Sequence, residues 1–240
     1  MAVKPKKIAK IIAGVIIFLT LPTLILFGFL YLKYNENIPT GVQGEQADAL
    51  AYKMLDALAY EAYNTTNYIE WTFKKRHHYE WDRVNNTCNV FWKANKVVLD
   101  LNDYSKSKAY IHSFKNESEI AQELIEKAIT YFNNDSFWLV APYKVFDKDV
   151  ERRLVKTNNN KDALLVTYTS GGSTPGDSYL WILDDNGKPT AYKMWTSILP
   201  IDGLEASWSD WTITESGAQL PTFHKLLFLG LEIDGVKGTK

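Results

Sequence analysis

The chain has 240 residues, a formal net charge of −1 and one cysteine, Cys88, which excludes an internal disulfide. Residues 1–34 contain five lysines and no acid, so the remainder has 22 basic and 28 acidic residues, a net charge of −6. This acidic balance argues against nucleic acid as a partner, and the lack of a disulfide means that a hydrophobic core must stabilise the body.

Residues 11–32 form an uncharged run that follows a basic tail, residues 1–10. A helix of this length spans roughly 33 Å, enough to cross a hydrocarbon core of about 30 Å. A cleaved signal peptide is the alternative, but its apolar region runs only about 7 to 15 residues and ends at a small-residue cleavage site. Residues 27–33 (FGFLYLK) offer no such site. The sequence therefore predicts a transmembrane signal anchor over residues 11–33.

The distribution of lysines predicts the orientation of this anchor. Four lysines precede the apolar run and only Lys33 follows it. By the positive-inside rule the N-terminus is cytoplasmic and the body lies outside. We therefore expect a single-pass inner-membrane protein with a periplasmic body.

Residues 34–45 carry Pro, Gly and amide side chains without an apolar period, so they are predicted to be a linker. If flexible, such a linker would reach about 20 Å. The folded domain is expected over residues 46–240. It opens with apolar residues at three- and four-residue spacing over 47–62, which is typical of an amphipathic helix.

Period-two alternation then predicts a meander of about four strands, over residues 68–74, 79–82, 90–92 and 97–101. A second helix is expected from an Asn116 cap, with Glu119 completing the cap, to about residue 133. The apolar run 137–142 follows, and Pro142 is expected to keep it out of a central strand.

Six further strands are expected over residues 150–156, 163–169, 178–184, 190–196, 206–214 and 221–229. Turn residues separate them, and Asn186-Gly187 is a strong hairpin signal. The predicted fold class is α+β: a curled antiparallel sheet, or half-open β-barrel, of about ten strands with helices on one face, preceded by one transmembrane helix.

Aromatic residues in these strands are more numerous than one thin layer needs. We therefore predict that some line a hydrophobic ligand cavity, and the candidates are Trp71, Phe73, Tyr79, Trp81, Trp92, Trp138, Tyr168, Trp181 and Trp195. The alternative is that they form ordinary core. Trp208 and Trp211 are three residues apart, so at least one is expected outside the core or beside a bulge.

Reactive groups do not form a recognisable motif. His77 and His78 are adjacent in a predicted strand and point to opposite faces, while His112 and His224 stand alone. No HExxH, GxSxG or phosphate-loop spacing is present. Cys88 is expected to be a packed thiol. We therefore expect no catalytic residue, metal or cofactor.

The order of elements resembles the half-open barrel of lipoprotein carriers of the LolA and LolB type. Three segments look like uncharacterised envelope proteins related to that fold: residues 135–147 (DSFWLVAPYKVFD), 174–181 (TPGDSYLW) and 208–211 (WSDW). The resemblance implies a concave barrel that binds acyl chains, with helices acting as a lid, and it implies no catalytic residue.

Three functions follow as hypotheses. The first is a non-enzymatic domain that binds a lipid, acyl chain or lipoprotein in the aromatic-lined cavity beside the membrane. The second is an envelope protein–protein interaction or sensory domain whose barrel is filled by side chains. The third, an enzyme, would need a convergent polar site that the sequence does not reveal.

Overall fold

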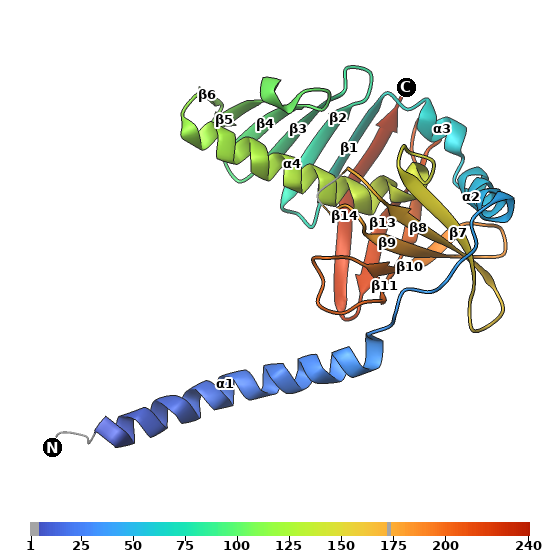
Figure 1. Ribbon diagram of the computed structural model, residues 1–240. Helices are drawn as coiled ribbons and strands as arrows, with labels where there is room; N and C mark the ends of the chain where they lie inside the picture. The colour runs from blue at the N-terminus through green and yellow to red at the C-terminus, as the bar shows by residue number, and fades with distance from the viewer. Residues whose placement is uncertain (1–4, 172–173) are drawn as a thin grey trace.

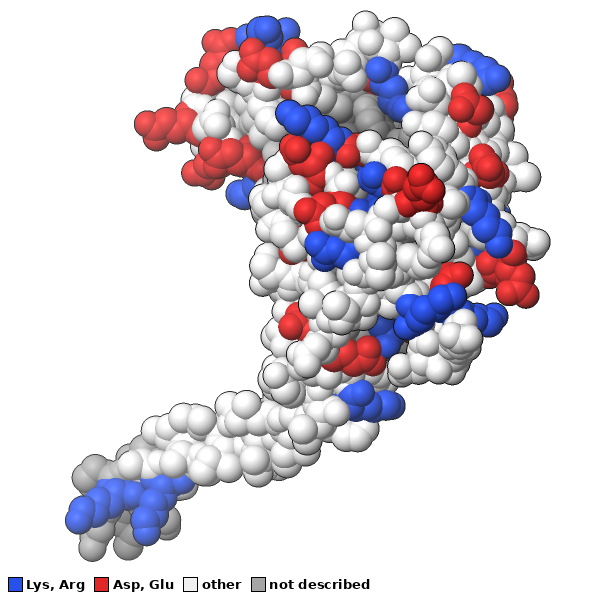
Figure 2. Space-filling view, turned by 45° about the vertical axis from the view of Figure 1, so that its right-hand side comes forward, with Lys and Arg blue, Asp and Glu red and all other residues white. Residues whose placement is uncertain are grey.

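α1, Pro5–Tyr34, projects from the rest of the molecule as a rod (Figure 1). The computed structural model describes residues 5–171 and 174–240, so the first four residues of the predicted basic tail lie outside the described chain. Within α1, the stretch Ala9–Tyr34 is long and apolar enough to cross a membrane. Figure 2 shows its uncharged length, with lysines gathered at the N-terminal end. Pro22 lies inside the helix without ending it.

The body is an α+β fold built on one large antiparallel sheet that is curled but not closed (Figure 1). Its described residues form fourteen strands rather than the ten expected. These are β1 Tyr68–Phe73, β2 His77–Asp82, β3 Thr87–Trp92, β4 Asn95–Asp100, β5 Lys108–Ile111, β6 Phe114–Asn116, β7 Val150–Lys156, β8 Asp162–Tyr168, β9 Ser178–Leu183, β10 Pro189–Trp195, β11 Leu204–Ser207, β12 Ser209–Ile213, β13 Gln219–Leu226 and β14 Leu229–Thr239.

The strands follow the order β6-β5-β4-β3-β2-β1-β14-β13-β11-β10-β9-β8-β7, and β12 pairs with β13 beside this path. The last strand, β14, thus joins the two halves of the sheet, because it pairs with β1 on one side and β13 on the other. In β1 and β3, buried and half-buried residues alternate, as the period-two pattern predicts. The single predicted strand 206–214 is two strands, β11 and β12, which are separated at Trp208.

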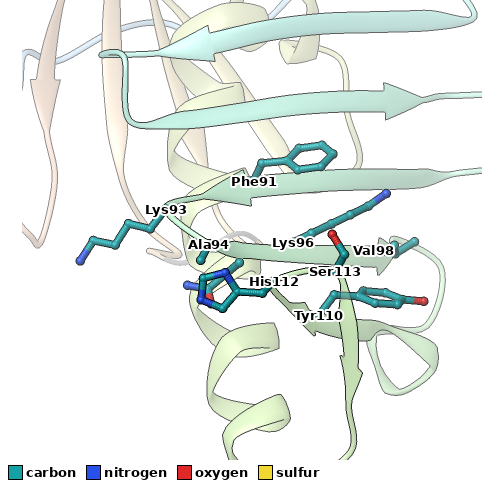
Figure 3. Close-up of a pocket in the computed structure, with 9 residues that line it drawn as sticks. Phe91, Lys93, Ala94, Lys96, Val98, Tyr110, His112 and Ser113 are labelled. Carbon is teal, nitrogen blue, oxygen red and sulfur yellow. The ribbon is translucent and has the colours of Figure 1, made fainter.

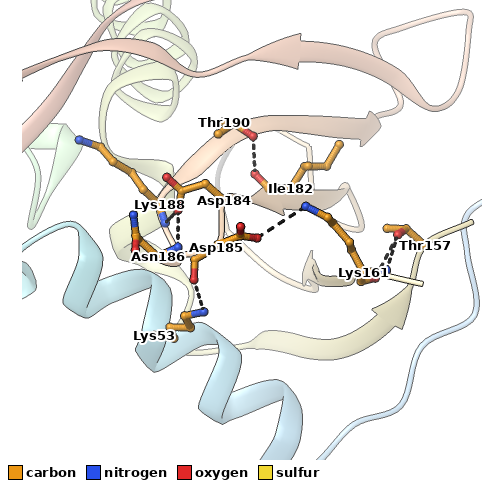
Figure 4. Close-up of polar contacts among 9 residues, drawn as sticks. All are labelled: Lys53, Thr157, Lys161, Ile182, Asp184, Asp185, Asn186, Lys188 and Thr190. Carbon is orange, nitrogen blue, oxygen red and sulfur yellow. Dashed lines mark hydrogen bonds and ion pairs between the residues drawn. The ribbon is translucent and has the colours of Figure 1, made fainter. Parts of the chain in front are cut away.

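The first predicted helix is divided into α2, Glu45–Ala57, and α3, Tyr60–Asn64. Ala59 adopts a left-handed conformation between them. α2 packs against β7 and β8. The Lys53 ammonium donates a 2.7 Å hydrogen bond to the carbonyl of Asp185 in the β9–β10 turn (Figure 4). That turn holds Gly187 at φ 96°, where an added Cβ would meet Lys53, so glycine is required there.

The second helix, α4, runs from Glu119 to Val140 and extends past the predicted end at residue 133. It includes most of the apolar run 137–142, which lies in no strand, as expected. A short 3₁₀ turn, η2 (Ala141–Lys144), follows and contains Pro142. Ser118, not Asn116, is the N-cap residue, and the Asn116 side chain instead accepts a hydrogen bond from the Ser118 backbone.

Residues 35–44, predicted as a linker, lie against the outer face of the second half of the sheet, and we call them the strap. Trp195 Nε1 donates to the Glu36 carbonyl at 2.8 Å. Val42 forms a β-bridge with Leu154 of β7, the strand at one end of the sheet. An added Cβ on Gly41 would lie 2.7 Å from the Arg153 Cβ. The strap therefore holds the end of α1 close to the body.

Candidate functional site

α4 lies along the sheet (Figure 1). Its aromatic side chains pack against those of the strands. In the first half of the sheet, the ring centroid of Phe132 lies 5.3 Å from that of Trp81 and 6.3 Å from that of Trp71. Tyr131 packs edge-on against Trp92 at 5.6 Å. Side chains of the helix thus occupy the space next to the predicted cavity residues of β1, β2 and β3.

The second half of the sheet is packed in the same way. Phe137 lies 4.6 Å from Tyr179 and 5.5 Å from Tyr168 between ring centroids. Trp138 lies 5.5 Å from Tyr192. We call the buried side chains between α4 and the sheet the interior.

The structure places eight of the nine predicted cavity residues in one hydrophobic cluster with α4. They are Trp71, Phe73, Tyr79, Trp81, Trp92, Trp138, Tyr168 and Trp181. Trp195 is the exception, because it belongs to a small separate cluster beneath the strap. Its neighbour Met194 faces the interior, so alternation along β10 turns Trp195 to the other face.

Asp135 of α4 is a polar residue within the interior and is 2% exposed. Its Oδ2 atom accepts hydrogen bonds from the Tyr79 hydroxyl at 2.6 Å and lies 2.7 Å from His77 Nδ1. Oδ1 accepts from the Asn134 side-chain amide at 2.7 Å. Burial, followed by the nearby Asp135 charge, raises the pKa of Tyr79, so Tyr79 donates its proton throughout the physiological range. The contacts of Asp135 join α4 to β2.

A second polar group in the interior is His224 of β13, which is fully buried. It packs against Trp208 at 4.5 Å and Trp138 at 5.1 Å. Burial lowers its pKa to about 4, although the Ser207 carbonyl beside Nδ1 favours the charged form. His224 is therefore neutral at pH 7.

Several buried nitrogen atoms lack a hydrogen-bond partner among the described residues. They are Nε1 of Trp71, Trp81, Trp181 and Trp208, and Nε2 of His224. An unsatisfied buried polar group costs about 1–3 kcal/mol. The four indole N–H groups can each donate to an acceptor, whereas Nε2 of neutral His224 can only accept, because Nδ1 faces the Ser207 carbonyl and carries the proton.

Arg83, just after β2, lines an open cleft on the surface of the body. Its Nη1 donates to the carbonyls of Tyr63 at 2.5 Å and Thr66 at 2.7 Å. The guanidinium stacks 4.3 Å from the Tyr63 ring centroid, and Tyr63 stacks at 3.9 Å on Tyr143. Burial raises the pKa of Tyr63 to about 12, although Arg83 opposes the shift.

This Arg83 cleft has a volume of about 360 Å³, and its other lining residues include Tyr60, Asn67, Trp81, Val84, Lys144 and Asp147. Lys144 and Asp147 form a loose ion pair at 3.6 Å. Arg83 forms no ion pair with any described residue. Because one guanidinium carries five N–H donors, the cleft can receive a carboxylate or another planar acceptor.

Metal-binding and nucleophilic arrangements are not apparent. No group of three or more His, Cys, Asp or Glu side chains within residues 5–171 and 174–240 is placed to hold a metal ion. His77 and His78 point to opposite faces as predicted, since His77 meets Asp135 and His78 meets Thr72. Cys88 is buried, as predicted, and burial raises the pKa of its thiol.

Sequence reasoning missed Asp135, His77 as its partner, and Arg83. Asp135 could have been found by continuing the second helix beyond residue 133, because Ala128, Phe132, Asp135 and Leu139 share one helical face. Arg83 carries no comparable signal, since its contacts depend on the position of α3 beside the end of β2.

The chain matches no protein-family model, and it has no match among curated proteins.

Proposed function

We propose that this protein is a non-enzymatic, membrane-anchored domain that contacts another protein of the cell envelope through the Arg83 cleft. α1 would be a single-pass anchor in the inner membrane, with a cytoplasmic N-terminus and a periplasmic body. The observation that carries this proposal is the filled interior: Trp71, Tyr79 and Trp181 are fully buried. Ligand pockets are usually preformed, so a filled interior favours binding at the outer surface.

The Arg83 cleft suits a protein partner by composition and position. Arginine, tyrosine and tryptophan are the residues most often found at energetic centres of interfaces. The cleft lies beside the end of β2 that pairs with Tyr68, and Tyr68 also pairs with Thr239 at the end of β14. The start of β14 lies at the side of the body from which α1 leaves (Figure 1), so the length of this 11-residue strand, roughly 35 Å, separates the cleft from the anchor.

The partner is expected to present an acidic group to Arg83. A photoreactive amino acid at Val84, which is 65% exposed and lines the cleft, would test this in membranes containing the full chain. We expect one protein adduct that Lys144→Glu weakens, because the substitution reverses a charge of the cleft. The matched control places the probe at Ile213, which is 72% exposed and lies outside the cleft. An adduct of equal yield at Ile213, or one insensitive to Lys144→Glu, would contradict the proposal.

Binding of a lipid or acyl chain between α4 and the sheet is the second candidate function. The unpartnered indole nitrogens favour it, because they could bind the oxygen atoms of a lipid. Entry would require α4 to leave the sheet, and the Asp135 hydrogen bonds oppose that movement. Burial of an acyl chain contributes about 0.8 kcal/mol per methylene.

Uptake of a fluorescent fatty acid by the full chain in nanodiscs distinguishes this second candidate. Asp135→Asn should increase uptake if α4 is the lid, whereas Asn116→Ala, outside the interior, should not. No uptake by the wild type or by Asp135→Asn would remove lipid binding as a function.

A further inference from the structure

Three hairpin turns of the first half of the sheet lie at the same edge from which α1 leaves. β1–β2, β3–β4 and β5–β6 are successive antiparallel hairpins, so their turns share one edge. Phe73 pairs with Ile233, which places the β1–β2 turn toward the start of β14. Ala206 pairs with Leu226, so the β13–β14 turn lies beside Leu204. Asp202 in the adjacent loop bonds to Asn35 and Glu36, directly after α1.

We call this edge the lower rim, and its β1–β2 and β3–β4 turns are basic. The β1–β2 turn consists of Lys74, Lys75 and Arg76, all exposed, and the β3–β4 turn contributes exposed Lys93. Lys75 pairs with Glu232 at 2.9 Å. The other three residues form no ion pair with any described residue. Two turns with four basic residues and no acid contrast with a body whose net charge is −6.

A groove lies beside the turns of β3–β4 and β5–β6, with a volume of about 590 Å³ (Figure 3). Its lining includes the rings of Phe91 and Tyr110, the cation of Lys96, and His112. Lys96 Nζ lies 5.1 Å above the Phe91 ring. No acidic side chain lines the groove within the described part of the chain. Its chemistry therefore suits an anion attached to an apolar group.

The backbone of the two turns is also unusual. Lys93 has φ 52°, while His112 and Ser113 have φ 48° and φ 69°, conformations that glycine adopts with less strain. Eleven described non-glycine residues have positive φ, and three of them line this one groove. Strained residues of this kind often cluster where side chains serve a binding function.

We propose that the lower rim rests on the bilayer and that the groove binds the phosphate of an anionic lipid headgroup. This inference rests on the proposed anchor, which holds the rim near the membrane. Basic side chains within about 10 Å of an anionic surface are attracted to it. Lys96 would contact the phosphate, and Phe91 and Tyr110 would lie against the apolar part of the lipid. Lys93, whose side chain points away from that of Lys96 (Figure 3), would contact the surrounding anionic surface.

Headgroup contact can be measured in the full chain reconstituted in vesicles. A nitrobenzoxadiazole fluorophore is attached at Ser113→Cys on the lower rim or at Val84→Cys on the opposite edge, each in a Cys88→Ala background. A lipid with a spin label on its headgroup serves as the quencher. In phosphatidylcholine vesicles containing phosphatidylglycerol, we expect quenching at Ser113→Cys to exceed that at Val84→Cys at least about threefold.

Charge variants test the role of the groove. The double variant Lys93→Gln, Lys96→Gln should remove most of the difference in quenching between the two edges. The control Lys106→Gln should not, because the Lys106 side chain is 70% exposed and lies outside the groove. Equal quenching at the two edges, or no effect of removing Lys93 and Lys96, would overturn the inference. The fluorescence at Ser113→Cys is also measured with inorganic phosphate in vesicles without anionic lipid. If it changes with phosphate but not with phosphatidylglycerol, the groove binds a free anion, and membrane docking is overturned. Alkaline carbonate extraction tests the anchor separately, because release of the protein would refute the anchor itself.

Discussion

The hydroxyl of Tyr79 on β2 lies 2.6 Å from Oδ2 of Asp135 on α4, and both residues are buried. His77 Nδ1 meets the same oxygen at 2.7 Å while its ring stacks on Tyr131 at 4.0 Å. One carboxyl group thus connects α4 to two side chains of the sheet. These polar contacts hold the helix in one position against an otherwise apolar surface.

Removing this carboxyl group should destabilise the fold. Asp135→Ala leaves the Tyr79 hydroxyl without its acceptor, so we expect the free energy of unfolding to fall by about 3 kcal/mol. Urea denaturation followed by tryptophan fluorescence measures this change. Tyr79→Phe, which deletes only the hydroxyl, should cost less, about 1–2 kcal/mol. A stability of Asp135→Ala equal to wild type would show that these contacts do not hold α4.

His224 should make the fold less stable in acid. Its folded pKa of about 4 lies below the ordinary histidine value of 6.5, so the unfolded chain binds a proton more readily. The stability that neutral His224 contributes is fully present above pH 6.5. As pH falls from 6.5 toward 4, the free energy of unfolding drops by about 3 kcal/mol in total. Unfolding free energies of wild type and His224→Phe across this range measure the effect. The variant should show a shallower decline, and parallel curves for the two proteins would refute the assignment.

Truncation of an interior tryptophan should affect stability rather than partner contact. Trp181→Ala leaves a large cavity next to Trp208 and Tyr192, and we expect a loss of about 3–5 kcal/mol. At a temperature where the variant stays folded, the Val84 adduct should keep its wild-type yield. Ile213→Ala, at an exposed position, should change stability by less than about 0.5 kcal/mol. Loss of the adduct in folded Trp181→Ala would tie partner binding to the interior.

The strap should be released by filling the space at Gly41. A valine there would clash with the backbone-proximal atoms of Arg153 and with Val155. We expect Gly41→Val to make residues 35–44 more sensitive to protease in the full chain. Val42→Ala is the control, because Val42 is 73% exposed and its bridge to Leu154 uses backbone atoms. Unchanged protease resistance of Gly41→Val would show that Gly41 does not determine strap docking.

The regular strands could be predicted because the alternation of apolar and polar residues indicates which face of a strand is buried. β1 and β3 follow this rule, and the strand 150–156 was predicted with its observed bounds. β14 escaped detection because Gly230, Gly235 and Gly238 and its charged residues resemble a polar tail. Its position between β1 and β13 supplies the hydrogen bonds that its composition does not suggest.

The candidate site was predictable to the extent that it depends on local spacing. Eight of the nine aromatic residues named from the sequence share one hydrophobic cluster, and their role as the lining of a ligand cavity stays a prediction. Trp195 lies outside that cluster, which the sequence does not reveal because β10 buries both faces and adjacent Met194 and Trp195 are equally apolar. The Asp135–His77 contact joins residues 58 positions apart, and only the curl of the sheet around α4 brings them together.

In our proposal α4 fills the interior and the outer Arg83 cleft binds the partner. A photoreactive amino acid at Phe132, in the interior, compared with one at Val84 in the full chain in membranes, tests it most directly. We predict that Phe132 reacts only within the chain, while Val84 yields a protein adduct that Lys144→Glu weakens. A lipid adduct at Phe132, with no charge-dependent protein adduct at Val84, would contradict the claim and identify the interior as a lipid site.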